Sequence, residues 1–390
     1  MSPKKVAILL PWLKMGGTNK IALNFIKDLS EYCDVTLILS QNTGELLSDL
    51  PDNITVIVDK MQGFKQLLKK DLKGIQIKNL WKDLKYYHRI RQGQDSIDNY
   101  KYIVDRNPII TEEEFDCAIS YHGQSPERLL NLLYRMKSKK RIAWIHGEIS
   151  FDEDKCARLQ KYYQQVDHFF FVSNPTRDSF AKVFPCCQGK TTVYYNPINK
   201  QEIIEQSLET MNIEYDPSYF NILTVGRLSN EKGQTMVPEI VALLKQDGFK
   251  VRWYLMGDGD TKAQIEEKIK ALQVQQDVYL LGTIYNPYPY IKNCDLYVQP
   301  SFTEGYSTTI CEAGILGKAI IGTEPSGGIK DQITSGLDGE IVEATVDSLK
   351  KTIEHLINNR TIIRQYEQNI LDKNFEGTGE IKKFLDYLAE

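Results

Sequence analysis

The sequence predicts an α/β protein made of two doubly wound domains, each a parallel sheet with helices on both faces. Short apolar strands alternate with amphipathic helical patterns from one end of the chain to the other. A polar stretch ending in Asp216-Pro217 interrupts this alternation near the middle and is expected to be an irregular linker. The chain has 390 residues, enough for two domains of ordinary size.

The expected strands follow the apolar runs of the sequence. In the first half they lie at 6–13, 35–40, 54–59, 116–121, 141–146, 168–173 and 192–196. In the second half they lie at 220–226, 251–257, 277–282, 295–300 and 319–323. Helices are expected after Gly16-Gly17, near 235–247, near 262–273, from about 307 and at the C-terminal end. Such sheets bind ligands at the carboxyl ends of their strands, so functional residues are expected there.

Composition excludes several classes of protein. Apolar residues make up 42% of the chain and charged residues 26%, as in ordinary globular proteins, and a net charge of −4 gives no nucleic-acid signal. Residues 1–195 are net basic and the rest net acidic, so the first half is expected to meet an anionic partner. Seven cysteines without a Cys-x-x-Cys pair indicate a reducing compartment.

The first residues imitate a secretory signal, with two lysines before an apolar run. Pro11 and Lys14 interrupt that run, and an amphipathic helix follows instead of a cleavage site. No apolar run approaches the roughly 20 residues that span a bilayer. The expected location is therefore the cytoplasm, with attachment to the inner face of the membrane as an open possibility.

The most informative stretch is SFTEGYSTTICEAGILGKAIIG at 301–322. A buried strand ends in a loop that carries Glu304, and a helix opens near Ser307-Thr308-Thr309 with Glu312 inside it. Loop hydroxyls and free N–H groups at a helix start form an anion site. The acid before the start can accept hydrogen bonds from sugar hydroxyls, and the later acid can hold a ribose. A capping box that only stabilises the helix explains the same spacing equally well.

The pair of glutamates in EGYSTTICEA resembles the signature of family 4 glycosyltransferases, which have the GT-B fold of two Rossmann-like domains facing a central cleft. Further family motifs follow in the same order along nearly the whole chain. The resemblance implies that the donor is bound by Gly16, Gly17, Gly226, Gly257, Ile284, Gly305, Tyr306, Ser307, Thr308, Thr309 and Glu312. It implies catalytic roles for His146, Arg227, Lys232 and Glu304.

In the family, a histidine placed like His146 meets the donor sugar, and a basic pair like Arg227 and Lys232 clamps the pyrophosphate. The resemblance also implies that the backbone at Ile284 reads the base. It implies that Glu304 holds sugar hydroxyls rather than acting as a base, since in the family the acceptor attacks from the face that the diphosphate leaves. The alternatives are a strand cap for His146 and surface ion pairs for the two basic residues.

Two departures from the family pattern stand out. Ser307 occupies a position where glycine is common, which is tolerable if its φ is negative. Asn196-Pro197 replaces a common Asn-Gly and is expected to alter acceptor contacts. Gly327-Gly328 matches a later glycine pair that borders the cleft.

The resemblance also implies the organisation of the chain. Residues 1–198 form the N-terminal acceptor-side domain, 199–218 a linker, 219–372 the C-terminal donor domain, and 373–390 a helix that crosses back to the first domain. The implied activity is retaining transfer of a hexose or N-acetylhexosamine from a nucleotide diphosphate sugar, with UDP expected as the nucleotide. The acceptor is a glycan, a lipid-linked sugar or a protein, in capsule, exopolysaccharide or cell-wall polymer synthesis. No cofactor or metal is expected.

Two other functions stay open, namely a nucleotide-sugar epimerase of the same fold and a non-catalytic partner subunit of a glycosyltransferase. A nicotinamide dehydrogenase is disfavoured because Gly16-Gly17 lacks the third glycine of a dinucleotide fingerprint. Asp258-Gly259-Asp260 spells a metal-binding pattern, but a helix cap at Asp260-Thr261 explains it better. His122 follows a strand, and the resemblance assigns it no role.

Residues 64–91 carry many lysines and arginines beside an apolar stripe at helical spacing, with Gly74 as an expected break. One interpretation is a surface that binds anionic lipid, where a lipid-linked acceptor is found. The favoured alternative is that the stripe packs on its own domain and the lysines are solvated. The sequence leaves the oligomeric state open.

Overall fold

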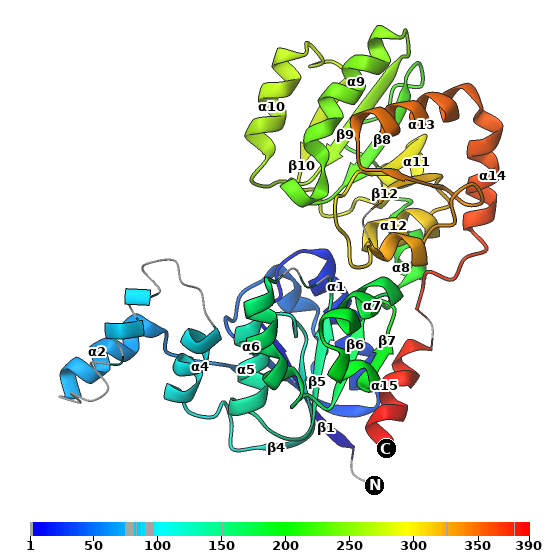
Figure 1. The fold of residues 1–390 in the computed structure, drawn as a ribbon. Coiled ribbons are helices and arrows are strands. Elements are labelled where there is room, and N and C mark those ends of the chain that lie inside the picture. The colour runs from blue at the N-terminus through cyan, green and yellow to red at the C-terminus, as the bar shows by residue number, and fades with distance from the viewer. Residues whose placement is uncertain are drawn as a thin grey trace. The chain divides into compact units, whose positions relative to one another are not determined.

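The structure, a computed structural model, describes residues 3–74, 82, 84–86, 88–89, 97–147, 149, 151–324, 327–377 and 379–390. It confirms the α/β class, because it holds two parallel sheets with helices packed around them (Figure 1). The chain divides into two compact units. The first comprises Met1–Val172, Thr176–Tyr195 and Gly379–Glu390, and the second comprises Ser173–Pro175 and Asn196–Thr378.

The sheet of the first unit has the strand order β3-β2-β1-β4-β5-β6-β7, with every neighbouring pair parallel. Its strands confirm the expected positions: β1 Lys4–Leu10, β2 Cys33–Leu39, β3 Thr55–Val58, β4 Glu114–Ser120, β5 Lys137–Ile145, β6 His168–Phe171 and β7 Thr191–Val193. The apolar runs are continuous because a parallel sheet is covered on both faces. The described helices are α1 Gly17–Ser30, α2 Phe64–Gly74, α4 Ile97–Arg106, α5 Pro126–Arg135, α6 Glu153–Tyr163, α7 Asn174–Val183 and α15 Glu380–Ala389.

An aromatic cluster joins the last helix to the first unit. The ring of Phe25, on α1, lies 4.9 Å from that of Trp144 and 5.4 Å from that of Phe384, on α15. All three side chains are fully buried. Burial of aromatic rings is among the largest sources of stability in a core, so α15 is anchored in this unit although it follows the second in the chain.

The sheet of the second unit has the order β10-β9-β8-β11-β12-β13, again all parallel. Its strands are β8 Phe220–Val225, β9 Val251–Met256, β10 Val278–Gly282, β11 Leu296–Gln299, β12 Ile320–Glu324 and β13 Glu340–Glu343. Its helices are α8 Lys200–Gln206, α9 Val237–Gln246, α10 Lys262–Ala271, α11 Tyr288–Asn293, α12 Thr308–Ile315, α13 Val346–Asn358 and α14 Arg360–Ile370. The edge strand β13 was not expected, since its four residues are only half-buried or exposed and form no apolar run.

The prediction of an irregular linker over 199–218 is wrong for its first part. Helix α8 lies there, and the Asn199 side chain caps it by accepting a hydrogen bond from the backbone N–H of Glu202 at 3.1 Å. Its sequence, KQEIIEQ, is too polar to reveal a helix that buries only Ile203. The structure places this segment in the second unit, which begins at Asn196.

The basic segment 64–91 lies largely outside the described residues. Its helix α2 is described over Phe64–Gly74, where it buries Leu67 and Asp71 and leaves Lys65, Lys69 and Lys70 exposed. The expected break at Gly74 borders residues outside the described ones and stays a prediction. No helix in the described parts of the chain has the length and apolar character needed to cross a bilayer.

Candidate functional site

The carboxyl edge of the second sheet carries a buried carboxylate. Glu304 lies in the loop between β11 and α12, and its side chain is 8% exposed. Its Oε1 accepts hydrogen bonds from Lys232 Nζ at 2.7 Å, Ser301 Oγ at 2.8 Å and Gln299 Nε2 at 3.1 Å. Lys232 follows β8, which is the sheet neighbour of β11. The sheet order therefore brings together two charges that lie 72 residues apart in the sequence.

Gln299, the last residue of β11, extends this network to the start of α12. Its Oε1 accepts hydrogen bonds from Tyr297 OH at 2.8 Å and from Thr309 Oγ1 at 3.3 Å. Thr309 Oγ1 lies 3.1 Å from Ser307 Oγ. A single hydrogen-bonded chain thus runs from the Lys232 ammonium to the hydroxyls of the first helical turn. Such a network holds its members in fixed positions.

A second buried amide, that of Gln332, fixes the backbone at the helix start. Its Oε1 accepts a hydrogen bond from Ser307 N at 3.0 Å, and its Nε2 donates to Ser307 O at 2.6 Å. Ser307 precedes α12 with φ −80°, and its side chain makes no capping bond. The capping-box interpretation is therefore wrong, while the negative φ meets the condition for serine at this position. The N–H groups of Thr308 and Thr309 lie in the first turn, where a helix offers them no acceptor of its own.

Close backbone packing explains the glycines at this edge. Gly328 N donates to Glu304 O at 3.1 Å, and a Cβ on Gly328 would lie 1.8 Å from Gly305 O. A Cβ on Gly257, which follows β9, would lie 2.1 Å from the carbonyl oxygen of Gly226, which follows β8. Only glycine allows these loops to approach one another so closely.

The other residues of this unit that were predicted to bind the donor lie on α12, in the loop before it and after β10. Glu312 is 8% exposed inside α12, and its Oε1 accepts a hydrogen bond from Tyr288 OH at 3.2 Å. Tyr306 and Ile284 are half-buried, and Ile284 follows β10. Arg227 is not part of the network: its side chain is 67% exposed and pairs with Glu231 at 2.5 Å.

The Asp258-Gly259-Asp260 turn shows no metal site. Within the described chain, no three His, Cys, Asp or Glu side chains are grouped as metal ligands would be. The prediction of a helix cap at Asp260-Thr261 is right in position, since Thr261 is the N-cap residue of α10, but wrong about the bond, since its side chain makes no capping hydrogen bond. Its hydroxyl is buried and has no hydrogen-bond partner in the described structure.

The predicted residues of the first unit lie at the carboxyl edge of its own sheet. Gly16 and Gly17 open α1, and His146 follows β5. Burial lowers the pKa of His146 to about 3, against a hydrogen bond to the Tyr121 backbone that raises it, so the imidazole is neutral. Its Nε2 is buried and unpartnered among the described residues. Burial, with smaller effects from His146 and Arg128, also keeps the pKa of His122 well below its usual value.

Sequence reasoning missed two residues, Gln299 and Gln332, that hold the site of the second unit. The signal for Gln299 was present, since it is a polar residue at the end of the buried strand DLYVQP. A buried side-chain amide needs hydrogen-bond partners. At the carboxyl end of a strand, those partners are polar groups of the functional site. Gln332 gives no comparable signal, because its partner lies 25 residues away.

Comparison with known proteins adds three findings. Residues 212–373 match the family model described as glycosyl transferases group 1. An uncharacterized glycosyltransferase of Methanocaldococcus jannaschii is 25% identical over 55% of this chain and 57% of its own length. An N-acetylgalactosamine-N,N'-diacetylbacillosaminyl-diphospho-undecaprenol 4-alpha-N-acetylgalactosaminyltransferase of Campylobacter jejuni is 27% identical over 46% and 48%. The chain thus spans about half the length of these curated relatives.

The whole chain resembles solved structures. Anabaena HepE in complex with UDP and glucose superimposes with a TM-score of 0.72 at 16% identity, over 99% of both chains. This likeness identifies the fold. The chain therefore has the GT-B architecture of two Rossmann-like domains, and its residues 212–373, which hold the Lys232–Glu304 network, match the group 1 glycosyl transferases.

Proposed function

We propose that this protein is a retaining glycosyltransferase that moves a hexose or N-acetylhexosamine from a UDP-sugar to an acceptor. The observation that carries the proposal is the Lys232–Glu304 pair, held by Gln299 beside the start of α12. The family match covers this network, and the structural relative was solved with UDP and glucose.

The chemistry follows from electrostatics. Departure of a nucleoside diphosphate builds negative charge on its phosphate oxygens, and the barrier falls when fixed donors meet that charge. Lys232 supplies a cation, and the first turn of α12 supplies N–H groups at the positive end of a helix dipole. Among the described residues Arg227 pairs only with Glu231, and its side chain is exposed, so a phosphate can compete for its guanidinium. These groups supply the positive charge, so the proposal includes no metal.

Glu304 is suited to hold the transferred sugar. Its Oε1 already accepts three hydrogen bonds, while Oε2 has no partner within the described chain. The carboxylate is thus fixed in place with one oxygen left to accept from sugar hydroxyls. In this proposal the acceptor hydroxyl attacks from the side that the diphosphate leaves, which retains the anomeric configuration without an enzyme nucleophile.

For the acceptor we propose a glycan carried on a lipid at the cytoplasmic face of a membrane, in the assembly of a surface polymer. The Campylobacter relative is named for an acceptor linked to undecaprenol through a diphosphate. The exposed lysines of α2 fit an anionic lipid surface. Sedimentation with anionic vesicles at low salt, reversed by high salt, is the expected result; no sedimentation at low salt would remove the membrane from the proposal.

A donor panel tests the activity. UDP-, GDP- and ADP-sugars are incubated with the protein, alone and with lipid-linked acceptors, and products are identified by mass spectrometry and by the anomeric coupling in NMR. Slow hydrolysis or transfer of one UDP-sugar with α retained is expected. An epimerised sugar would identify an epimerase, and the absence of any product or of thermal stabilisation by UDP would indicate a non-catalytic subunit.

A further inference from the structure

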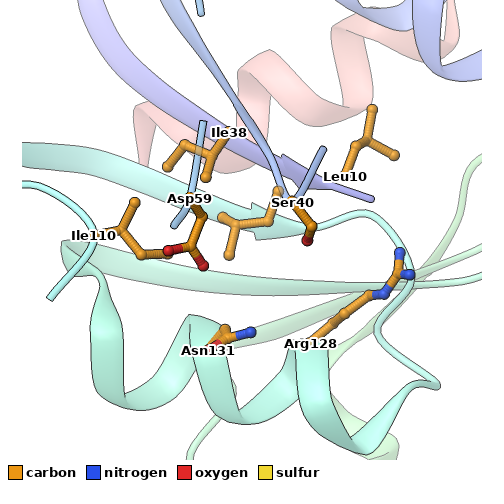
Figure 2. A pocket seen from close by; sticks show the side chains of 8 residues that line it. Leu10, Ile38, Ser40, Asp59, Ile110, Arg128 and Asn131 are labelled. Atoms are coloured by element: carbon orange, nitrogen blue, oxygen red, sulfur yellow. The ribbon is translucent and has the colours of Figure 1, made fainter. Parts of the chain in front are cut away.

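The first unit contains a cavity at the carboxyl ends of β1 and β2, closed on one side by α5. Figure 2 shows the side chains of Arg128 and Asn131 extending from α5 toward the strands that carry Leu10 and Ile38. The residues that line the cavity are Leu9, Leu10, Ile38, Ser40, Asp59, Ile110, Arg128 and Asn131. Its enclosed space is about 20 Å³, the room of one water molecule, and the exposed Ser40 marks its open side.

Two arginines of α5 differ in their charge partners. Arg135 donates to both oxygens of Asp59 at 2.7 Å, and its side chain is 2% exposed, so this pair is neutral. Arg128 lies two turns earlier on the helix. Arg128 is half-buried as a whole, but its Nη1 is buried and has no hydrogen-bond partner among the described residues, and its guanidinium forms no ion pair with any of them. Asp59 is the acid that lines the cavity, and Arg135 already neutralises it, so the cavity retains the positive charge of Arg128.

This arrangement is costly, because an arginine does not lose its proton and the buried Nη1 has lost water without gaining an acceptor. Burial acts to lower the pKa of Arg128, and Glu127, its sequence neighbour, acts weakly in the opposite direction without forming an ion pair. The nearby His122 is neutral and brings no negative charge. No described residue therefore balances the charge of Arg128, which leaves this charge available to an anionic ligand.

We propose that Arg128, with the Ser40 hydroxyl, binds a phosphate-type oxyanion carried by the sugar acceptor, at the open side of this cavity; the acceptor role rests on the proposed function. The planar guanidinium offers two parallel N–H donors that match phosphate oxygens. Leu10 and Ile38 line the inner side with apolar groups, which strengthens the interaction. The enclosed space is too small for a phosphate, so in this proposal the anion binds at the mouth and the acceptor sugar extends from the sheet edge.

Isothermal titration with inorganic pyrophosphate tests the site. The protein is first saturated with UDP, so that pyrophosphate does not fill the proposed donor site, and the Arg128→Gln variant is compared with wild type. Arg158→Gln is the matched control, since it removes the same charge from an exposed helix position of the same unit. We expect Arg128→Gln to weaken binding at least tenfold and Arg158→Gln to change it less than twofold. Equal affinity in Arg128→Gln, or no pyrophosphate binding by wild type, would overturn the proposal.

Two further measurements distinguish a failure of this anion site from a failure of the proposed donor site. Lys232→Ala, titrated without UDP, should keep the Arg128-dependent binding even if the protein proves not to bind UDP, so this site and the donor site fail independently. The melting temperature of ligand-free Arg128→Gln should equal or exceed that of wild type, because the variant removes a half-buried charge whose Nη1 has no partner among the described residues. A clear fall in melting temperature would show that Arg128 is a structural ion-pair partner and would overturn the proposal.

The source of the oxyanion is resolved with acceptor analogues in the UDP-sugar assay. A methyl glycoside, the corresponding sugar 1-phosphate and a short-chain prenyl diphosphate sugar are compared by KM. We expect the KM for either anionic acceptor to be at least tenfold below that for the methyl glycoside. In Arg128→Gln this difference in KM should disappear, with little change in kcat. If only the prenyl compound shows the effect, the oxyanion is that of a lipid carrier. A methyl glycoside that reacts as well as both would contradict an anionic acceptor.

Discussion

The carboxyl edges of the two sheets treat their polar side chains differently. In the second unit, Lys232, Glu304, Gln299 and Thr309 form one hydrogen-bonded network, although Ser229 Oγ and Gln234 Oε1 on either side of Lys232 are buried without a partner among the described residues. In the first unit, the corresponding edge holds buried polar atoms without partners among the described residues. They belong to Ser120, Tyr121, Arg128, Trp144, His146 and Tyr194.

This difference separates two ways of preparing a site. A network that is satisfied before the ligand arrives holds its donors in fixed positions, which is what stabilisation of a leaving group requires. Unpaired buried groups cost stability in the free protein and recover it when a ligand or water supplies the missing partner. We therefore expect changes in the second unit to affect turnover most, and changes in the first to affect stability, its pH dependence and binding.

The largest effect is expected for Lys232→Ala. Loss of one fixed donor to the developing charge should lower turnover at least 100-fold, or about 3 kcal/mol. The free energy of unfolding should fall by less than about 2 kcal/mol, because Glu304 keeps its bonds from Gln299 and Ser301. Lys351→Ala, which breaks an exposed pair with Asp347, is the control. Initial rates and urea unfolding of both variants decide whether the network is catalytic or only structural.

Gly328→Ala tests how tightly the second edge is packed. The added methyl would lie 1.8 Å from Gly305 O, so the loop that carries Glu304 must move. We expect a loss of about 3 kcal/mol in the free energy of unfolding together with reduced turnover. Gly189→Ala, whose methyl meets nothing within 4 Å, should change stability by less than about 1 kcal/mol. Equal stabilities for the two variants would mean that this edge tolerates movement.

The pH dependence of stability should arise mainly in the first unit, where burial lowers the pKa of His146, His122 and His168. The contribution of His146 can be followed by itself. Its pKa of about 3 in the folded state lies below the 6.5 of an unfolded histidine, so its contribution is complete above pH 6.5 and is lost as the pH falls toward 3. Between pH 7 and pH 5 the loss is about 2 kcal/mol. Urea unfolding at pH 7 and pH 5 measures the loss in the free energy of unfolding. This loss should be smaller in His146→Gln and unchanged in His355→Gln, a variant of an exposed histidine on α13. Identical losses in all three proteins would contradict the assignment.

The smallest effect is expected for Thr261→Val. Its hydroxyl is an unpartnered buried atom of the second unit, at the N-cap of α10 and outside the network. Replacing it by a methyl group of similar shape should raise the free energy of unfolding by up to about 1 kcal/mol. Thermal unfolding and initial rates are measured together. A drop in turnover would show that an unpartnered atom of this unit also contributes to ligand binding or catalysis. The two edges would then not differ in the way described above.

Parts of the candidate site could be predicted from the sequence because they are local. The loop with Glu304 and the helix start at Ser307 follow one buried strand within a few residues, and their order alone marks an anion site. The sequence did not show that Lys232 meets Glu304 or that Gln332 holds Ser307, and it ranked Arg227 beside Lys232. The structure separates these two basic residues, since one is bonded inside the network and the other pairs with Glu231 in solvent.

The sequence by itself determined the alternation of strands and helices, because apolar periodicity depends on near neighbours. It did not reveal β13 or α8, whose short segments bury little apolar surface. Only the tertiary structure decided which charges meet. Lys232 reaches Glu304 because β8 and β11 are adjacent in the sheet, whereas Arg135 finds Asp59 and Arg128 finds no acid in the described chain. Such pairings depend on strand order, which the repeating pattern of each strand does not encode.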